Sequence, residues 1–410
     1  GKGFDPIGFW EPYGSDSLGF SGEFLGQDYS IYNLLLNRPT ENAVALFACL
    51  SRGARINGLN LVKTTVHGQD YVGMFAAEIY SNRTSDIVID NCHCYGDVQG
   101  RGIVGGFCGE AYAFYQKLII TNCSTNGKIV GEGRVGGFVG RATSDVKTLE
   151  ISYSSSDCIV VGTVQGGNGM GGFCGTASIN WSGKMNIEQC ISTGLVSGKN
   201  ILGGFVGKFS AFADENNFEI VNCASLGSVV GENHIGGFCG VIAYENDIST
   251  PMIEECYSIG AVEGEFEARG FCGIQRSIEK SDMNYCYYDA ETSGRDSSDG
   301  GTGKITAQMK TRSTFETWDF DEIWDIDPEI NNGYPFLRCL PTVSVEEFVS
   351  PQAKKLDIIP NPAQDQIQVS IDEEFAVISL VKISDLSGRL MLTSKTDRIN
   401  ISELNSGIYI

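Results

Sequence analysis

The chain has 410 residues, a formal net charge of −22, and a composition in which 42% of residues are hydrophobic. That apolar fraction is enough to build a large core, so global disorder is excluded. The acidity argues against a nucleic-acid-binding protein, which needs Lys and Arg to neutralise phosphates. No apolar run is long enough for a membrane-spanning helix.

The first residues, Gly1-Lys2-Gly3-Phe4, lack the charged and apolar regions of a signal peptide. Such a start is typical of a cytoplasmic protein or of the mature form of an exported one.

An internal repeat dominates the first two thirds of the chain. In six units a cysteine is followed fifteen residues later by a phenylalanine, with glycines four and eight residues after the cysteine. Each unit closes on Gly-Gly-Phe-(Cys/Val)-Gly, except that Arg269 replaces the first glycine in the last unit. The pairs are Cys92 and Phe107, Cys123 and Phe138, Cys158 and Phe173, Cys190 and Phe205, Cys223 and Phe238, and Cys256 and Phe271.

The composition of the repeat favours strands over helices. No segment carries apolar residues at helical spacing, whereas glycine interrupts short stretches rich in Val, Ile and Phe. We predict an all-β protein in which each unit of about 31 to 35 residues is one coil of a parallel β-solenoid (β-helix). A coil would hold two or three strands, and neighbouring coils would lie about 4.8 Å apart.

The repeat fades at both ends. Val44, Phe47 and Phe75 keep its register, with Asn60 in the cysteine position, and Cys286 begins a unit that never finishes. Atypical terminal units are expected to cap a stacked array. We therefore expect a cap with degenerate first coils at residues 1–70, the repeats at 71–290, and a second cap at 291–340.

One side of the coil varies in length. The stretch from phenylalanine to the next cysteine runs from 15 to 20 residues, so insertions fall on the side of the solenoid that often binds partners. These loops carry aromatic residues, namely Tyr112, Phe114, Tyr115, Trp181, Phe209, Phe212 and Tyr244. The rings either cover the flank of the solenoid or form an exposed stacking surface for a carbohydrate or protein.

The cysteines fit packing better than chemistry. Equivalent side chains on parallel neighbouring coils keep Cβ atoms about 4.8 Å apart, whereas a disulfide needs about 3.8 Å. We expect mostly free, buried thiols. A second column, Cys108, Cys174, Cys239 and Cys272, alternates with Val139 and Val206, which supports a packing role. Cys92-His93-Cys94 is the one metal-like cluster, and no second ligand pair accompanies it, so no metal or cofactor is expected.

No catalytic motif stands out. The three histidines occupy different repeat positions, and carboxylates are scattered over loops without a distinguished pair. A non-catalytic protein is expected.

The composition changes after Cys339. A stretch rich in Ser, Val, Glu, Pro and Lys suggests a linker at 341–355. Short alternating segments follow at Leu356–Ile359, Gln366–Ile371, Ile378–Ile383 and Leu390–Ser394, separated by turn signals. They predict a small antiparallel, immunoglobulin-like β-sandwich at 356–410.

Two family resemblances follow from these motifs. The Gly-Gly-Phe-(Cys/Val)-Gly signature, preceded by segments such as Asn222-Cys223-Ala224-Ser225, resembles the GLUG-motif repeats of bacterial surface proteins. The segment from Asp299-Gly300-Gly301 to Asn332-Gly333-Tyr334-Pro335-Phe336-Leu337 looks like the usual end of such arrays. The resemblance covers about residues 1–340 and implies an adhesin-like surface protein.

The tail is similar to the C-terminal sorting domain of type IX secretion cargo. The matching segments are Ile359-Pro360-Asn361-Pro362, Ile383-Ser384-Asp385-Leu386-Ser387-Gly388-Arg389 and Leu404-Asn405-Ser406-Gly407-Ile408-Tyr409-Ile410. The resemblance implies export by a Bacteroidetes-like bacterium, contact with the type IX machinery, and an extracellular or cell-surface location. The family pattern continues through one more strand and a basic end, whereas this sequence stops at Ile410.

These observations favour a monomeric, secreted or cell-surface adhesin that binds a host glycan or a surface protein through the variable loops. A carbohydrate-active β-helix enzyme or accessory module, and a passive stalk, are the alternatives. Exposed rings would favour the adhesin, and a groove holding two or three carboxylates would favour the enzyme.

Overall fold

The computed structural model describes residues 1–11, 19–82, 85–163, 168–213, 218–244, 252–276 and 283–340. In the tail it describes 356–359, 366–371, 381–384, 390–394, 396, 398–402 and 404. The chain divides into two compact units, Gly1–Val343 and Ser344–Ile410. The division falls inside the stretch that the sequence suggests as a linker.

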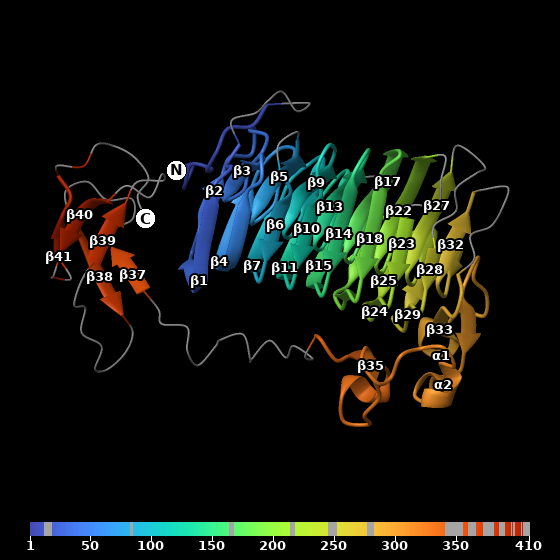
Figure 1. Cartoon of the computed structure of the whole chain (residues 1–410). Coiled ribbons are helices and arrows are strands. Elements are labelled where there is room, and N and C mark those ends of the chain that lie inside the picture. The colour runs from blue at the N-terminus through green and yellow to red at the C-terminus, as the bar shows by residue number, and fades with distance from the viewer. Residues whose placement is uncertain are drawn as a thin grey trace. The chain divides into compact units, whose positions relative to one another are not determined.

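The first unit is a parallel β-solenoid, which confirms the predicted fold class (Figure 1). One coil runs through four strands, β9 (Cys108–Ala113), β10 (Leu118–Thr121), β11 (Ser124–Gly131) and β12 (Arg134–Gly136), rather than the two or three expected. The extra division has a local cause. Asn122, between β10 and β11, has a left-handed backbone with φ of 50°, and this residue turns the strand into a corner.

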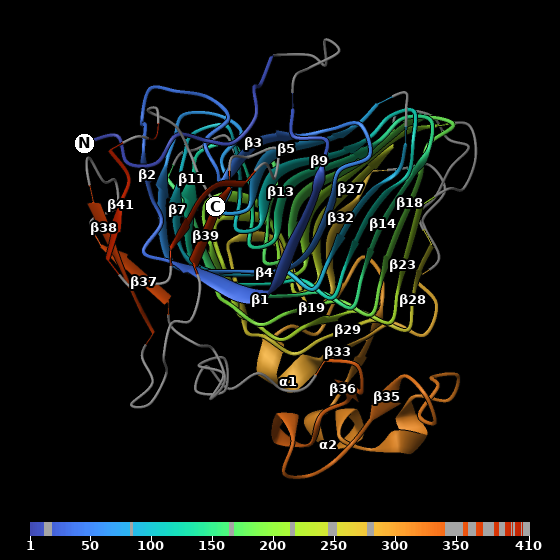
Figure 2. The same cartoon turned by 60° about the vertical axis from the view of Figure 1, so that its left-hand side comes forward.

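Three sheets, which we call A, B and C, form the walls of the solenoid (Figure 2). Sheet B stacks β9 with β3 (Phe47–Leu50), β5 (Ala76–Ser81), β13 (Val139–Ser144), β17 (Cys174–Trp181), β22 (Val206–Ala213), β27 (Cys239–Tyr244) and β32 (Cys272–Gln275). Sheet C stacks β12 with β8 (Ile103–Gly105), β16 (Met170–Gly171), β21 (Asn200–Gly203), β26 (Asn233–Gly236) and β31 (Phe266–Arg269).

Sheet A forms the remaining wall in two rows. The row before the corner holds β10 with β6 (Ile87–Asp90), β14 (Thr148–Ser152), β18 (Lys184–Glu188), β23 (Phe218–Val221) and β28 (Met252–Glu254). The row after the corner holds β11 with β7 (His93–Gln99), β15 (Ser155–Gly162), β19 (Ile191–Ser192), β20 (Val196–Ser197), β24 (Ala224–Ser225), β25 (Val229–Val230), β29 (Tyr257–Ser258), β30 (Val262–Glu263), β33 (Tyr287–Asp289) and β34 (Thr302–Lys304). At the N-terminal end β1 (Glu23–Tyr32), β2 (Leu35–Asn37) and β4 (Arg55–His67) begin the stack.

The repeat phenylalanines form a continuous stack in the core. From Phe47 to Phe271 each ring lies 4.5 to 5.5 Å, centroid to centroid, from the ring of the next coil. All are fully buried. Because each ring buries much apolar area and meets two others, this column is a main source of cohesion between coils.

The closing glycines stand where backbones meet. A Cβ on Gly204 would lie 2.2 Å from the carbonyl oxygen of Gly237 in the next coil, and a Cβ on Gly203 would lie 1.9 Å from the carbonyl oxygen of Val206. The Gly-Gly-Phe turn that joins sheet C to sheet B therefore has no room for a side chain at these two positions.

The strand register corrects two assignments made from the repeat. Ser124 pairs with Ser155, and Gly127 pairs with Cys158, so Ser154 rather than Cys158 takes the place of Cys123 in its coil. Cys158 instead occupies the glycine column, and its spacing of fifteen residues to Phe173 is a coincidence. The stretch from Ser154 to Phe173 is longer than its equivalents, so this insertion lies between β15 and β16, on the side expected to be constant in length.

The second correction concerns the first complete coil. Asn60 pairs with His93, so Leu59 takes the place of Cys92. The register shifts between Val62 and Thr64, where Lys63 has a left-handed backbone and adds one residue to β4. This bulge moved the apparent cysteine position by one residue.

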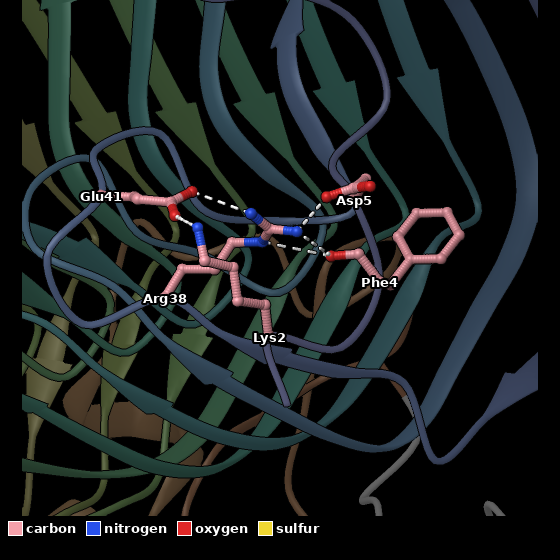
Figure 3. Close-up of polar contacts among 5 residues, drawn as sticks. All are labelled: Lys2, Phe4, Asp5, Arg38 and Glu41. Atoms are coloured by element: carbon pink, nitrogen blue, oxygen red, sulfur yellow. Dashed lines mark hydrogen bonds and ion pairs between the residues drawn. The ribbon is translucent and has the colours of Figure 1, made fainter. Parts of the chain in front are cut away.

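The N-terminal segment is tied to the first coil by one arginine (Figure 3). The guanidinium of Arg38, 8% exposed, donates to the carbonyl oxygen of Phe4 at 3.2 Å and to the carboxylates of Asp5 and Glu41. Lys2 also pairs with Glu41. The short backbone bridge between Ile7 and Phe47 continues this attachment.

The C-terminal cap covers the outer face of sheet A. It comprises α1 (Ala290–Ser293), α2 (Thr306–Met309), η1 (Arg312–Thr314), β35 (Trp324–Asp325), η2 (Asn331–Gly333) and β36 (Phe336–Leu337). Trp318 and Trp324 pack against Tyr257 and Tyr287. In the two coils before Tyr257 this column holds Ala224 and Ile191, and in the coils before those it is polar, with Ser155 and Ser124. The indole Nε1 of Trp324 donates to Asn222 Oδ1 at 2.8 Å. The change from polar to apolar residues in this column therefore explains where the cap lies.

The second unit has antiparallel strands. β37 (Leu356–Ile359) pairs with β38 (Gln366–Ile371), which pairs with β41 (Arg398–Asn400). β39 (Val381–Ser384) pairs with β40 (Leu390–Ser394). Three of the four strands predicted from sequence have the predicted bounds. Of the fourth, predicted at Ile378–Ile383, residues 378–380 lie outside the described residues, and β39 covers the rest and ends one residue later, at Ser384.

Candidate functional site

Aromatic residues gather at the corner that joins sheet B to the first row of sheet A. We call Tyr80, Tyr112, Phe114, Tyr115 and Trp181 the aromatic corner. They come from the ends of β5, β9 and β17 and from the turn after β9. Figure 1 shows β9, β13 and β17 side by side in the stack. Four successive coils, those of β5, β9, β13 and β17, thus supply or flank the corner.

The rings form one connected group centred on Phe114. Its ring lies 4.0 Å from that of Tyr115, 5.7 Å from that of Tyr112, and 6.2 Å from that of Trp181, centroid to centroid. Tyr80 lies 6.1 Å away. Trp181 belongs to a strand two coils from Phe114, so its ring leans across the intervening coil. Four of the seven aromatic residues predicted as binding candidates, Tyr112, Phe114, Tyr115 and Trp181, are therefore brought together.

The outer part of the corner is open to solvent. Trp181 is 65% exposed and Tyr115 is 36% exposed. Trp181 also has a left-handed backbone, with φ of 49°. Other bulky residues of the solenoid, such as Tyr153 and Tyr285, share this conformation, so it marks a tight turn. The corner thus presents a large, exposed ring at a turn of the wall.

A buried carboxylate holds the corner together. Asp145, in the middle coil, accepts hydrogen bonds from the hydroxyl of Tyr112 and, at 2.7 Å, from Nδ2 of Asn180. Burial, followed by the hydrogen bond to Asp145, raises the pKa of Tyr112 well above its usual value, so this hydroxyl stays protonated. Because Asn180 directly precedes Trp181, Asp145 connects the coils of β9 and β17 across its own coil and fixes the start of the turn that carries the indole.

The other predicted aromatic residues do not join the corner. Phe209 is 2% exposed and packs against Phe218, 5.0 Å between centroids, so it belongs to the core and is removed from the binding set. Its position on β22 places it on the inward side of the wall. Phe212 and Tyr244 lie on β22 and β27, but their side chains fall outside the described part of the structure.

Sequence reasoning missed Tyr80 and Asp145. Tyr80 pairs with Tyr112 across sheet B, so it is the equivalent residue one coil earlier. The signal was available, because Tyr80 and Tyr112 each stand five residues after a repeat phenylalanine. Asp145 gave no such signal, since a single carboxylate in a loop is ordinary.

A pair of buried carboxylates lies elsewhere on sheet B. Glu78 and Glu110 are direct neighbours across β5 and β9, at 7% and 1% exposure. Arg141 on β13 donates to both carboxylate oxygens of Glu110, at 2.5 and 2.6 Å. Burial and then the charge of Glu110 raise the pKa of Glu78 to about 8. The burial of both carboxylates denies access to a polymeric substrate.

The cysteines behave as the packing interpretation predicts. None of the fourteen forms a disulfide, and thirteen are buried, with Cys339 exposed. Burial raises the pKa of Cys174 to about 12, which keeps this thiol protonated and unreactive. Within the described ranges no group of three or more His, Cys, Asp or Glu side chains could hold a metal ion.

Comparison with known proteins identifies the family of the C-terminal tail. Residues 357–410 match the family model of the secretion system C-terminal sorting domain. This domain directs type IX export, so the protein is secreted or attached to the cell surface. No helix among the described residues is long and apolar enough to cross a membrane.

Two further likenesses are partial. A 51-residue stretch, 12% of this chain, is 47% identical to a "Putative Gly-rich membrane protein" of Evansella cellulosilytica and spans 6% of that protein's length. The crystal structure of a "putative immunoglobulin A1 protease" from Bacteroides ovatus covers 75% of this chain and 93% of its own, at 14% identity and a TM-score of 0.39. At that TM-score the likeness carries no argument about activity.

Proposed function

We propose that this protein is a non-catalytic, adhesin-like binding protein that engages a glycan or a surface protein through the aromatic corner. The observation that carries the proposal is the exposed indole of Trp181, joined to Phe114 and Tyr115 at the edge of a rigid β-wall. Aromatic side chains give large contact area at low entropic cost, and rigid elements position them well. The export signal of the tail supports an encounter with partners outside the cell.

The resemblance of the repeats to GLUG-motif surface proteins supports the same proposal. In the solenoid, the motif itself serves folding: its phenylalanine fills the core, and its glycines allow backbones to meet. Binding is therefore assigned to the corner that follows each sheet B strand, where residues are free to differ between coils. The repeat builds the scaffold, and three particular coils supply the site.

The carboxylates support a non-catalytic role. Glycoside hydrolysis needs two carboxyl groups on either side of a bound sugar. The paired carboxylates of the wall, Glu78 and Glu110, are almost completely buried, and Glu110 is held by Arg141. Asp145, at the aromatic corner, is also buried and already accepts two internal hydrogen bonds. Each of these groups has a structural task.

The test is a binding screen of the full chain against arrayed glycans and extracellular matrix proteins, with release of reducing sugar measured in parallel. The informative variant is Trp181→Ala, and the matched control is Phe266→Ala, because Phe266 on sheet C is 66% exposed. We expect partners whose binding falls with Trp181→Ala and persists with Phe266→Ala, without sugar release. Equal binding by both variants would contradict the proposed site, and sugar release would favour an enzyme.

A further inference from the structure

Three lysines border the aromatic corner on consecutive coils. Lys117, Lys147 and Lys184 each stand at or just before the start of the first-row strand that follows the corner. The amide of Lys184 donates to the carbonyl oxygen of Lys147 at 3.3 Å, so these two residues lie on adjacent coils in direct contact. All three side chains are exposed. The register aligns Lys117 with Thr148 and Thr148 with Lys184, so Lys117 and Lys184 share one column two coils apart. Lys147 stands one residue before that column, and the three lysines form a staggered row along the solenoid.

This row is unusual in so acidic a protein. The chain has 29 Lys and Arg residues against 51 Asp and Glu. In the corner segments 114–117, 145–147 and 182–184 the only carboxylate is Asp145, which is buried and hydrogen bonded to Tyr112 and Asn180. Every exposed charge within these three segments is thus positive. The acidic neighbours are Asp86, which accepts from the amide of Lys117, and Glu150, which pairs with the Lys117 ammonium. The end of the row at Lys147 and Lys184 therefore favours anions.

The lysines differ in how they are paired. Lys117 Nζ lies 3.2 Å from Glu150 Oε1, an exposed ion pair with side-chain exposures of 48% and 33%. Exposed pairs of this type contribute about 0–1 kcal/mol, so a ligand anion can replace the partner. Lys147 and Lys184 make no ion pair with any described carboxylate. At least two ammonium groups are available to a ligand beside the rings.

We propose that the ligand of the aromatic corner is an anionic polysaccharide whose pyranose rings carry carboxylate or sulfate groups. This inference rests on the proposed function and names its ligand class. The C–H face of a pyranose is apolar and stacks on an exposed indole, while its acidic substituents project from the ring edge toward the lysines. A surface of rings beside cations matches both parts of such a sugar, whereas a neutral glycan would leave the lysine row unused.

The spacing of the coils suits a polymer. Parallel neighbouring strands lie about 4.8 Å apart, so Lys117 and Lys184, two coils apart in one column, are separated by about 10 Å. An extended polysaccharide advances by about half that length with each pyranose unit, so acidic groups two units apart can meet these two lysines. Binding several charges along one chain also raises affinity through multivalency.

The test uses the full chain and two pairs of polymers in which one member is charged and the other neutral, polygalacturonate with its methyl ester and dextran sulfate with dextran. The variant is Lys147→Gln with Lys184→Gln. Its control is Lys63→Gln with Lys128→Gln, which removes the same charge from exposed positions on sheet A. We expect the corner variant to bind the acidic polymers on the order of tenfold more weakly at low salt, and the control variant to bind them as the wild type does.

The outcomes separate this inference from the proposed function. Salt-sensitive binding of an acidic polymer, lost in both Trp181→Ala and the corner lysine variant, supports both. Binding of neutral and acidic polymers alike, lost only in Trp181→Ala, overturns the anionic ligand and leaves the aromatic site standing. Binding that is limited to proteins and depends on Trp181 also overturns the anionic ligand and leaves the aromatic site standing. Binding unaffected by Trp181→Ala overturns both.

Discussion

The glycine pair of each coil marks the place where a polypeptide backbone touches the next one. Gly204 shows the constraint clearly, because a Cβ there would overlap the carbonyl oxygen of Gly237. A backbone atom cannot move aside as a flexible side chain can, so the overlap has to be relieved by displacing a coil. The short distance between neighbouring backbones therefore accounts for the glycines of the repeat signature.

A first prediction concerns this contact. Gly204→Ala should lower the free energy of unfolding by about 3 kcal/mol or more, because it forces strain into a closely packed wall. Gly294→Ala is the control, since its Cβ would meet no atom within 4 Å and only its left-handed backbone is penalised. Urea unfolding followed by circular dichroism measures both. Equal losses in the two variants would contradict the proposed clash.

A second prediction concerns the cysteine column. Ser154 already occupies it, and its hydroxyl accepts the amide of Cys123 at 3.2 Å, as the thiol of Cys223 accepts the amide of Cys190 at 3.4 Å. Cys223→Ser should thus cost less than about 2 kcal/mol, whereas Cys223→Leu should cost more by overfilling the core. Unfolding in urea under reducing conditions distinguishes them. A serine variant as unstable as the leucine variant would show that the thiol has a role beyond packing.

At the scale of single strands and coils, sequence and structure agree where spacing is set by contact between coils. The phenylalanine stack and the second cysteine column have the predicted register because every coil must present the same residue to its neighbour. The prediction failed at Cys158, where an insertion of residues restored the fifteen-residue spacing by chance. Only the pairing of whole strands identifies such a coincidence.

The candidate site was less predictable than the scaffold. The sequence pointed to the loops that carry Trp181 and Tyr115, because rings in loops of variable length stand out, and the structure exposes both rings; their role in binding stays a prediction. It could not tell that Phe209 faces the core, since the loop and the strand before it have no fixed boundary in sequence. The role of Asp145 could not be predicted from the sequence either, because its hydrogen-bond partners come from the neighbouring coils.

A third prediction belongs to the wall of sheet B. Burial and the neighbouring Glu110 raise the pKa of Glu78 from 4.5 to about 8. The folded protein therefore holds this proton more tightly than the unfolded chain does. The resulting stabilisation is complete below about pH 4.5, falls as the pH rises from there to about 8, and changes no further above it.

Glu78→Gln removes this titration and keeps the shape of the side chain. The difference in unfolding free energy between wild type and variant should shift against the wild type as the pH rises from 5 to 8. Comparing the two proteins at each pH cancels the general repulsion expected in a chain of net charge −22. A difference that is constant across this range would show that Glu78 titrates normally. Glu263→Gln, on an exposed residue of sheet A, serves as the control.

At the scale of the whole molecule, folding and export are assigned to different parts of the chain. The solenoid and its caps lie within Gly1–Val343, and the sorting domain lies within Ser344–Ile410. A stacked array gains its stability from contacts between neighbouring coils. The Phe stack, the tie made by Arg38 and the C-terminal cap all lie within the first unit. We therefore expect the solenoid to fold without the tail.

The last prediction follows from this division. Deleting residues 344–410 should leave the β-rich circular dichroism spectrum and the urea midpoint of the solenoid nearly unchanged, because no part of its core is removed. The same deletion in the natural host should abolish appearance of the protein outside the cell, since the matched sorting domain is lost. Immunoblotting of cell-surface, medium and cell fractions measures export. A truncated protein that unfolds at a much lower urea concentration would mean that the tail stabilises the solenoid. Continued export of the truncated protein would mean that the export signal lies in another part of the chain.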